Sequence, residues 1–302
     1  MNSSEKPYTG HGTSFYVTTD EVARTVNLAI QLRRPILVEG EPGCGKTMLA
    51  YSIAAEKELG DPIKISVKST SRASDLLYRM DALRRLHDSQ TRENPEARFV
   101  YPYISLEPFG EAIWRGQRRV VLIDEVDKAD IDFPNDLLDV LDRFEFQIDV
   151  LPYHEESESP FPRTIRLPKD VLPPIVVITS NREKRLPEPF LRRCLYIRLR
   201  FPQTPEELRT IVEKNLALDE IEVEYAVIDA TIRAFLRIRS IALRGEIQKP
   251  PALTELIDWV KIVHWQGENP QNMDNPLPPY WETLFKNMQD LDQLERMAKQ
   301  AK

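Results

Sequence analysis

The stretch Gly40-Glu41-Pro42-Gly43-Cys44-Gly45-Lys46-Thr47 decides the fold, because it matches the phosphate-loop pattern G-x-x-x-x-G-K-[ST] at every required position. Glycines let consecutive backbone N–H groups turn toward a phosphate without Cβ clashes. A helix that begins near Gly45 would add the positive end of its dipole. Lys46 offers a cation to the β- and γ-phosphates, and the Thr47 hydroxyl is a ligand for Mg²⁺.

The sequence on either side of this stretch agrees with that interpretation. Residues 35–39 form a short apolar run that is typical of a buried strand, and residues 48–57 are good helix formers. A strand, a glycine-rich turn and a helix are the setting that the motif requires, which makes a chance match much less plausible. The candidate nucleotide-binding residues are Gly40, Glu41, Pro42, Gly43, Cys44, Gly45, Lys46, Thr47 and Met48.

A second apolar run, residues 120–123, ends in Asp124 and Glu125. Ligands of α/β sheets bind at the carboxyl ends of the strands, where these carboxylates would emerge. We expect Asp124 to hold Mg²⁺ through water and Glu125 to orient and polarise the attacking water. An apolar strand that ends in Asp-Glu is a weak signal by itself, and it gains its meaning from the phosphate loop.

Asn181 follows a further predicted strand, residues 175–179. It is either a hydrogen-bonding partner of the γ-phosphate or the lytic water, or an ordinary turn residue. The most basic stretch of the chain comes next, and it is either a solvated charge run or a phosphate-facing surface. This stretch contains Arg182, Lys184, Arg185, Arg192 and Arg193.

Composition narrows the class of protein. The 302 residues carry a formal net charge of −7, and 41% of them are hydrophobic. A soluble globular protein is therefore expected, and the acidity argues against nucleic acid as the main partner. Two cysteines are too few for a disulfide framework, and no apolar run is long enough to span a membrane. We expect a cytoplasmic protein.

Strands that alternate with helices up to about residue 202 predict an α/β domain, residues 1–202, with a parallel sheet and helices on both faces. Residues 203–302 show only helical patterns and predict a small all-helical domain. The remaining expected strands cover residues 63–67 and 195–199, with a hairpin of residues 146–151 and 164–167. The expected helices cover residues 75–86, 136–144, 206–218, 225–241, 252–265 and 280–298, and one that begins after Thr19 and Asp20.

The order of the motifs resembles that of the AAA+ ATPases. GEPGCGKT, VVLIDEVDKAD, ITSN and PEPFLRRC precede the helical domain, and the detail is similar to the MoxR-type branch of these P-loop ATPases. The resemblance covers about residues 15–265. It implies that residues 40–47 are Walker A, that Asp124 and Glu125 are the Walker B acids, and that Asn181 is sensor 1.

The resemblance also implies that an arginine finger acts on the nucleotide of a neighbouring subunit. Arg193 is favoured for this role, with Arg192 as the alternative. Sensor 2 is the weakest match: Lys249 fits best, where Arg is common, and Arg244 lies nearby. The helical domain would be the lid of the nucleotide site.

Two insertions are implied by the same resemblance: a helix-2 insertion within about residues 71–116 and a pre-sensor hairpin at about residues 144–167. Residues 101–103 belong to a pore-facing loop or, as we favour, pack the insertion. Glu155, Glu156 and Glu158 at the hairpin tip are more typical of a solubilising loop than of a docking patch.

The resemblance implies an ATP-driven and Mg²⁺-dependent machine that remodels or activates a protein partner, often one with a von Willebrand factor A domain. It also implies a ring, for which a hexamer is the family expectation. Other functions stay open. One is a nucleic-acid-directed AAA+ protein or a GTP-using restriction subunit. Another is a nucleotide-dependent switch, which Glu125 and Asn181 argue against. A small-molecule kinase fits least, because such an enzyme would need a lid and a pocket for the phosphate acceptor in place of the helical domain of residues 203–302.

Overall fold

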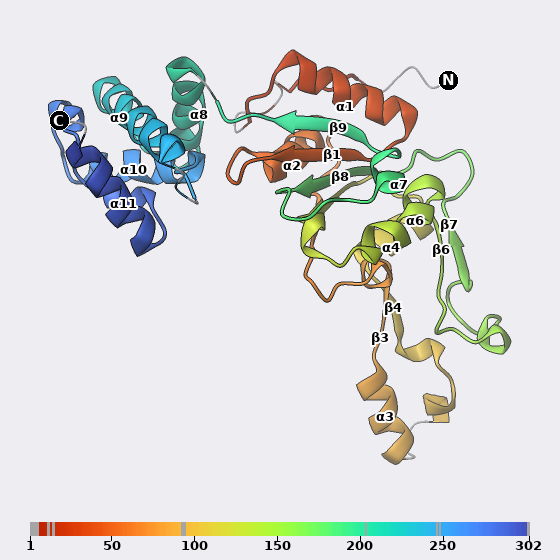
Figure 1. Cartoon of the computed structure of the whole chain (residues 1–302). Helices are drawn as coiled ribbons and strands as arrows, with labels where there is room; N and C mark the ends of the chain where they lie inside the picture. The colour runs from red at the N-terminus through yellow and green to blue at the C-terminus, as the bar shows by residue number, and fades with distance from the viewer. Residues whose placement is uncertain are drawn as a thin grey trace. The chain divides into compact units, whose positions relative to one another are not determined.

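The computed structural model describes residues 6–10, 13, 16–91, 95–202, 204–245, 247 and 249–300. Within them, a parallel sheet has five strands in the order β2-β5-β8-β1-β9 (Figure 1). These strands are β1 (Ile36–Gly40), β2 (Ile63–Ser66), β5 (Val120–Asp124), β8 (Ile175–Ser180) and β9 (Leu195–Leu199). The predicted α/β class with a parallel sheet is confirmed.

The two central strands β5 and β8 are apolar and buried along almost their whole length. That pattern belongs to a strand covered on both faces by helices. Ile123 of β5 pairs with Ile178 of β8, so Asp124 and Thr179 emerge together at the carboxyl edge. α1 (Asp20–Leu32) begins as predicted, with the Thr19 side chain accepting from the Val22 N–H, and α2 (Lys46–Glu56) follows the glycine-rich turn.

The segment between β2 and β5 differs from the sequence prediction. The predicted helix 75–86 is interrupted, because Leu76, Leu77 and Tyr78 are all buried and consecutive side chains of a helix cannot all face one core. Asp81 then starts a new helix by accepting the Arg84 N–H at 2.9 Å. The elements are η1 (Ala73–Leu76), β3 (Tyr78–Met80), α3 (Ala82–Thr91), η2 (Pro95–Arg98), η3 (Tyr101–Tyr103), β4 (Ile104–Leu106) and α4 (Pro108–Trp114).

Figure 1 shows the antiparallel pair β3–β4 carrying α3 at the end that lies away from the sheet. Tyr103 in η3 is buried, which supports packing of the insertion over a pore-facing role for residues 101–103. Its hydroxyl donates to Asp88 of α3 at 2.9 Å. Leu83, which the helical pattern placed on the same face as Leu76, Leu77 and Met80, is exposed on α3, and Leu86 is exposed as well.

The predicted hairpin exists as the antiparallel pair β6–β7, although its first strand ends at Gln147 and not at residue 151. At the tip, Glu155 is buried and not part of a solubilising loop, and this corrects the sequence interpretation of that residue. The predicted helix 136–144 is divided at Leu137. The elements here are η4 (Val126–Lys128), α5 (Asp132–Asp136), α6 (Leu138–Arg143), β6 (Glu145–Gln147), η5 (Tyr153–Glu155) and β7 (Thr164–Arg166), and α7 (Glu188–Leu191) follows β8.

The C-terminal region is helical, as expected, and Trp259 is fully buried at its core with its indole N–H donating to the Pro279 carbonyl at 3.0 Å. The predicted helix 280–298 is in fact two elements, because Asn287 caps a new helix by accepting the Asp290 N–H at 2.8 Å. The elements are α8 (Pro205–Leu218), α9 (Tyr225–Arg244), α10 (Leu253–Trp265), η6 (Pro270–Asp274), η7 (Trp281–Leu284) and α11 (Met288–Gln300).

The chain forms two compact units. The first comprises Met1–Gly12, Thr18–Glu39 and Lys46–Arg198, and the second comprises Thr13–Val17, Gly40–Gly45 and Leu199–Lys302. The domain boundary at residue 202 stays a prediction. Each helix in the described part of the chain is too short or too polar to cross a membrane.

Candidate active site

Asp124 is the centre of a hydrogen-bonded group in the first unit. Its Oδ1 accepts from the Thr47 hydroxyl at 3.2 Å and from the Thr179 hydroxyl at 2.6 Å. Thr47 belongs to the first turn of α2, Asp124 ends β5 and Thr179 lies in β8, so three elements bring these side chains together. The structure thereby unites the two residues that the sequence assigns to Mg²⁺.

These two side chains fit a magnesium ion. Carboxylate and hydroxyl oxygens are hard ligands, and Mg²⁺ in nucleotide sites takes one or two of them together with phosphates and waters. Asp124 also has a cationic neighbour, Lys64 of β2, whose Nζ lies 3.3 Å from Oδ2. Lys64 is 42% exposed, so solvent partly screens this ion pair.

Glu125 is held in an unusual backbone conformation, with φ 62° and ψ 50°. Its N–H donates to the Thr179 hydroxyl at 2.8 Å, and its side chain turns toward Asn181, whose Nδ2 donates to Oε1 at 3.2 Å. Lys128 lies 2.5 Å from the other carboxylate oxygen, and this hydrogen bond raises the pKa of the Lys128 ammonium group. The predicted water-orienting acid and the predicted sensor residue are therefore in contact.

Asp127 holds the turn that carries Asn181. This carboxylate is 2% exposed, and its Oδ2 accepts the backbone N–H groups of Asn181 at 3.0 Å and Glu183 at 2.8 Å. A buried carboxylate that accepts two N–H groups fixes the backbone strongly. Asn181 is thus positioned from the β5 side of the site.

The phosphate-loop stretch needs glycine at two positions. Gly43 has φ 73° and Gly45 has φ 90°, and other residues rarely adopt these angles. Lys46 follows at the start of α2, with 7% of its surface exposed. In the second unit, Glu41 of this stretch forms an ion pair with Arg239 of α9.

Comparison with known families agrees with this geometry. The model of the ATPase family associated with various cellular activities (AAA) matches residues 36–203, which is more than half of the chain. The chain belongs to the AAA family. It is therefore an ATPase with a P-loop nucleotide site. Curated proteins include no match to this chain.

Solved structures of AAA+ proteins are similar to it at low identity. A RuvB mutant from Thermotoga maritima has a TM-score of 0.44 and 18% identity, over 82% of this chain and 70% of that one. The RuvB Holliday junction branch migration motor of the same organism has a TM-score of 0.42 and 17% identity, over the same shares.

The two candidate residues for the arginine finger, Arg192 and Arg193, directly follow α7. Arg192 is 75% exposed and pairs with Glu188, four residues earlier. Arg193 is 37% exposed, and its Nε lies 2.5 Å from Asp142. Both guanidinium groups are partly exposed to solvent.

Sensor 2 is less well supported by the geometry of the second unit. Lys249 is exposed between α9 and α10, and Arg244 donates to the Ser240 carbonyl at 3.2 Å on its own helix. The cation of α9 that contacts the phosphate-loop stretch is Arg239, which sequence reasoning missed. The sequence feature that could have identified Arg239 is its position among the mostly apolar buried residues of α9.

Sequence reasoning also missed Thr179 and Asp127, which hydrogen-bond to Asp124, to the Glu125 N–H and to the Asn181 N–H. Thr179 is a polar residue near the end of the apolar strand β8, and Asp127 is an acid shortly after β5; these positions were their only local signals. A further ion pair links the Asn181 turn to β1: the Nε of Arg182 lies 2.5 Å from Glu39, and the Tyr196 hydroxyl donates to the same carboxylate at 3.0 Å.

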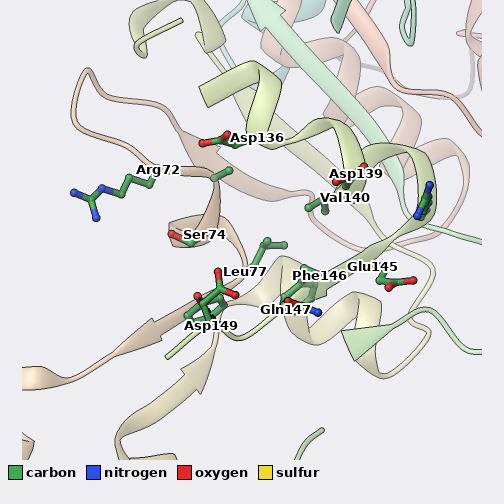
Figure 2. Close-up of a pocket in the computed structure, with 13 residues that line it drawn as sticks. Arg72, Ser74, Leu77, Asp136, Asp139, Val140, Glu145, Phe146, Gln147 and Asp149 are labelled. Atoms are coloured by element: carbon green, nitrogen blue, oxygen red, sulfur yellow. Dashed lines mark hydrogen bonds between the residues drawn. The ribbon is translucent and has the colours of Figure 1, made fainter. Parts of the chain in front are cut away.

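A groove in the first unit lies apart from all these residues. Its volume is about 660 Å³, and η1, α6 and β6 line it. Figure 2 shows the apolar Leu77, Val140 and Phe146 between the acidic Asp136, Asp139 and Asp149. The sequence predicted no site here.

Proposed function

We propose that residues 40–47 bind the triphosphate of ATP and that Thr47 and Asp124 hold Mg²⁺. Support comes from the hydroxyl–carboxylate contact between these two residues at the start of α2 and the end of β5. When bound, Mg²⁺ would neutralise charge that develops on the phosphate oxygens. Lys46 adds a second positive charge beside them.

Glu125 is the proposed base that orients the attacking water. Its contact with Asn181 carries this proposal, because the amide N–H₂ fixes one carboxylate oxygen and leaves lone pairs for a water proton. Asn181 is itself fixed through Asp127. The pair therefore has the arrangement of a general base with an orienting partner.

The site is completed, in this proposal, by a neighbouring subunit. AAA proteins commonly assemble as rings, and a hexamer is the expectation for this chain. Arg193, with Arg192 as the alternative, would reach the neighbour's γ-phosphate and complement the transition-state charge. Lys249 is the proposed sensor 2 residue of the lid.

The proposed biological role is MoxR-type remodelling or activation of a protein partner, which can include a von Willebrand factor A domain, in the cytoplasm. One observation favours a protein over nucleic acid as the partner: arginines of the most basic stretch form ion pairs within this chain. Arg182, Arg192 and Arg193 each form an ion pair with a carboxylate of this chain. Their charge is therefore largely compensated, in a chain of net charge −7.

Binding to labelled duplex and single-stranded DNA, measured by fluorescence anisotropy at 50 and 200 mM salt, tests this role. We expect no binding at either salt concentration and no change in ATP turnover when DNA is added. Affinity that falls by about 10³-fold between these salts, together with stimulated turnover, would assign the protein to nucleic acid.

A further inference from the structure

Arg239 is a cation buried inside the second unit. Its side chain is 6% exposed, and its Cζ lies 3.7 Å from the centroid of the Phe201 ring. The same ring stacks with Phe235, which precedes Arg239 by one turn of α9, at a centroid distance of 6.1 Å. A buried guanidinium group is costly unless charged and hydrogen-bonding partners satisfy it.

The partners of Arg239 belong to two separate segments. One amino group of the guanidinium donates to the Pro251 carbonyl, and the other donates to the carboxylate of Glu41. Glu41 is the second residue of the phosphate-loop stretch, and its side chain is 53% exposed. Arg239 of α9 is thereby joined to the loop that we propose binds the triphosphate.

A second contact of the loop adjoins the first. A Cβ placed on Gly43 would lie 2.9 Å from the Cβ of Ala252, so the two segments pack closely. Ala252 directly follows Pro251, the residue whose carbonyl Arg239 holds. Arg239 thus contacts Glu41 directly and also fixes the segment that touches Gly43.

Glu41 poses an electrostatic problem for the assigned function. A carboxylate in a phosphate-binding loop raises the negative potential where a triphosphate must bind. We infer that Arg239 is a positioning residue of the nucleotide site, which neutralises Glu41 and holds Glu41 and Gly43 in place for the phosphates. This inference rests on the proposed assignment of residues 40–47.

The Glu41→Gln variant separates this electrostatic role from a packing role, because the two roles predict opposite effects on ATP binding. If Arg239 neutralises Glu41, then Glu41→Gln binds ATP at least as tightly as the unchanged protein. If the ion pair only holds the structure together, Glu41→Gln weakens binding. Glu41→Gln keeps a side-chain oxygen that can accept a hydrogen bond from the buried Arg239 guanidinium, and thermal unfolding of this variant is measured beside its ATP affinity.

The experiment measures the Kd for Mg-ATP by titration calorimetry in the full chain. We expect Arg239→Met to weaken binding about tenfold, which corresponds to 1.4 kcal/mol, because the Glu41 carboxylate in the phosphate loop then lacks its guanidinium partner. The double variant Glu41→Gln/Arg239→Met should return to within about threefold of the unchanged protein. The deficit of Arg239→Met should shrink at high salt and be smaller for ADP than for ATP.

Arg239→Lys, which keeps the charge, is the matched control and should bind ATP more tightly than Arg239→Met. If Arg239→Met does not fold, as judged by thermal unfolding, the sign of the Glu41→Gln effect decides alone. Weaker ATP binding by Glu41→Gln, or a double variant no better than Arg239→Met, overturns the inference. Lys46→Ala tests the loop assignment separately, since ATP binding that survives this change would refute the assignment itself.

Discussion

Glu125 combines a strained backbone with the chemistry that we propose for it. A left-handed conformation costs a non-glycine residue about 1–2 kcal/mol. It persists here because the Glu125 N–H is held by Thr179 and its carbonyl accepts the Lys128 N–H at 3.0 Å. Such strained residues concentrate at functional sites. The backbone therefore supports a functional Glu125 independently of the sequence motif.

The hydroxyl of Thr179 contacts both proposed Walker B acids, Asp124 and Glu125. Thr179→Val keeps the shape of the side chain but leaves the Glu125 N–H unpaired and removes a donor from Asp124. We expect kcat for ATP to fall about tenfold, the size of effect that loss of a hydrogen bond to a charged group produces. Steady-state turnover and the Kd for ADP, which should change little, check this.

Thr179→Ser is the control for that change, because it retains the hydroxyl and loses only a methyl group. It should keep most of the turnover. Equal turnover in the valine and serine variants would show that the Thr179 hydroxyl does not position the acids.

At the scale of elements, the spacing of apolar residues in the segment 75–86 predicts one helix, and this prediction is wrong. Leu76, Leu77, Met80 and Leu83 have helical spacing, and yet Tyr78 stacks on Phe146 of β6 at 6.4 Å and pairs in a strand with Leu106. Partners that lie far along the chain outweigh the local helical preference here.

The tip of the β6–β7 hairpin is joined to residues 100 and 101 by Glu155. This carboxylate is 3% exposed and accepts the Val100 and Tyr101 N–H groups at 2.6 and 3.1 Å. Glu155→Gln removes the charge and one acceptor, so we expect a loss of about 1–3 kcal/mol in the free energy of unfolding. Hydrogen exchange at the amides of Val100 and Tyr101 should accelerate.

Glu158 supplies a matched comparison, because it lies three residues further along the same tip and is exposed. Glu158→Gln should leave both the free energy of unfolding and these exchange rates within error. Similar effects for the two substitutions would mean that Glu155 does not join the hairpin tip to residues 100 and 101.

At the scale of the whole molecule, the proposed ring makes a prediction about mixtures. Lys46→Ala removes the triphosphate cation but keeps the finger, and Arg193→Ala does the reverse. Each variant alone should turn over ATP at least about 10³-fold more slowly, the cost of losing an arginine finger. Mixed rings contain some sites with an intact loop facing an intact arginine, so mixing should restore part of the turnover.

Dilution supplies the second half of this test. Turnover per protomer of the unchanged protein should rise with concentration until rings are complete. A mixture without rescue, at concentrations where sizing shows rings, would contradict an arginine acting between subunits. Arg192→Ala mixed with Lys46→Ala identifies the finger if Arg193→Ala retains activity.

The sequence by itself determined those features of this protein that lie within one continuous stretch of residues. Residues 40–47 carry the whole phosphate-loop pattern, and the apolar runs of β1, β5 and β8 are visible because a strand buried on both faces has few polar residues. The α/β class followed from these local signals, and the AAA family followed from the resemblance in the order of the motifs. These features can be predicted because backbone turns and buried strands depend mainly on residues that are neighbours in the sequence.

Only the tertiary structure decided which distant residues act together. Strand order brings Thr179 beside Asp124, 55 residues apart, and folding of the second unit brings Arg239 to Glu41, 198 residues apart. The breaks in the predicted helices have the same origin. Long-range contacts depend on how strands and helices are arranged in space, and the spacing of residues along the chain does not encode that arrangement locally.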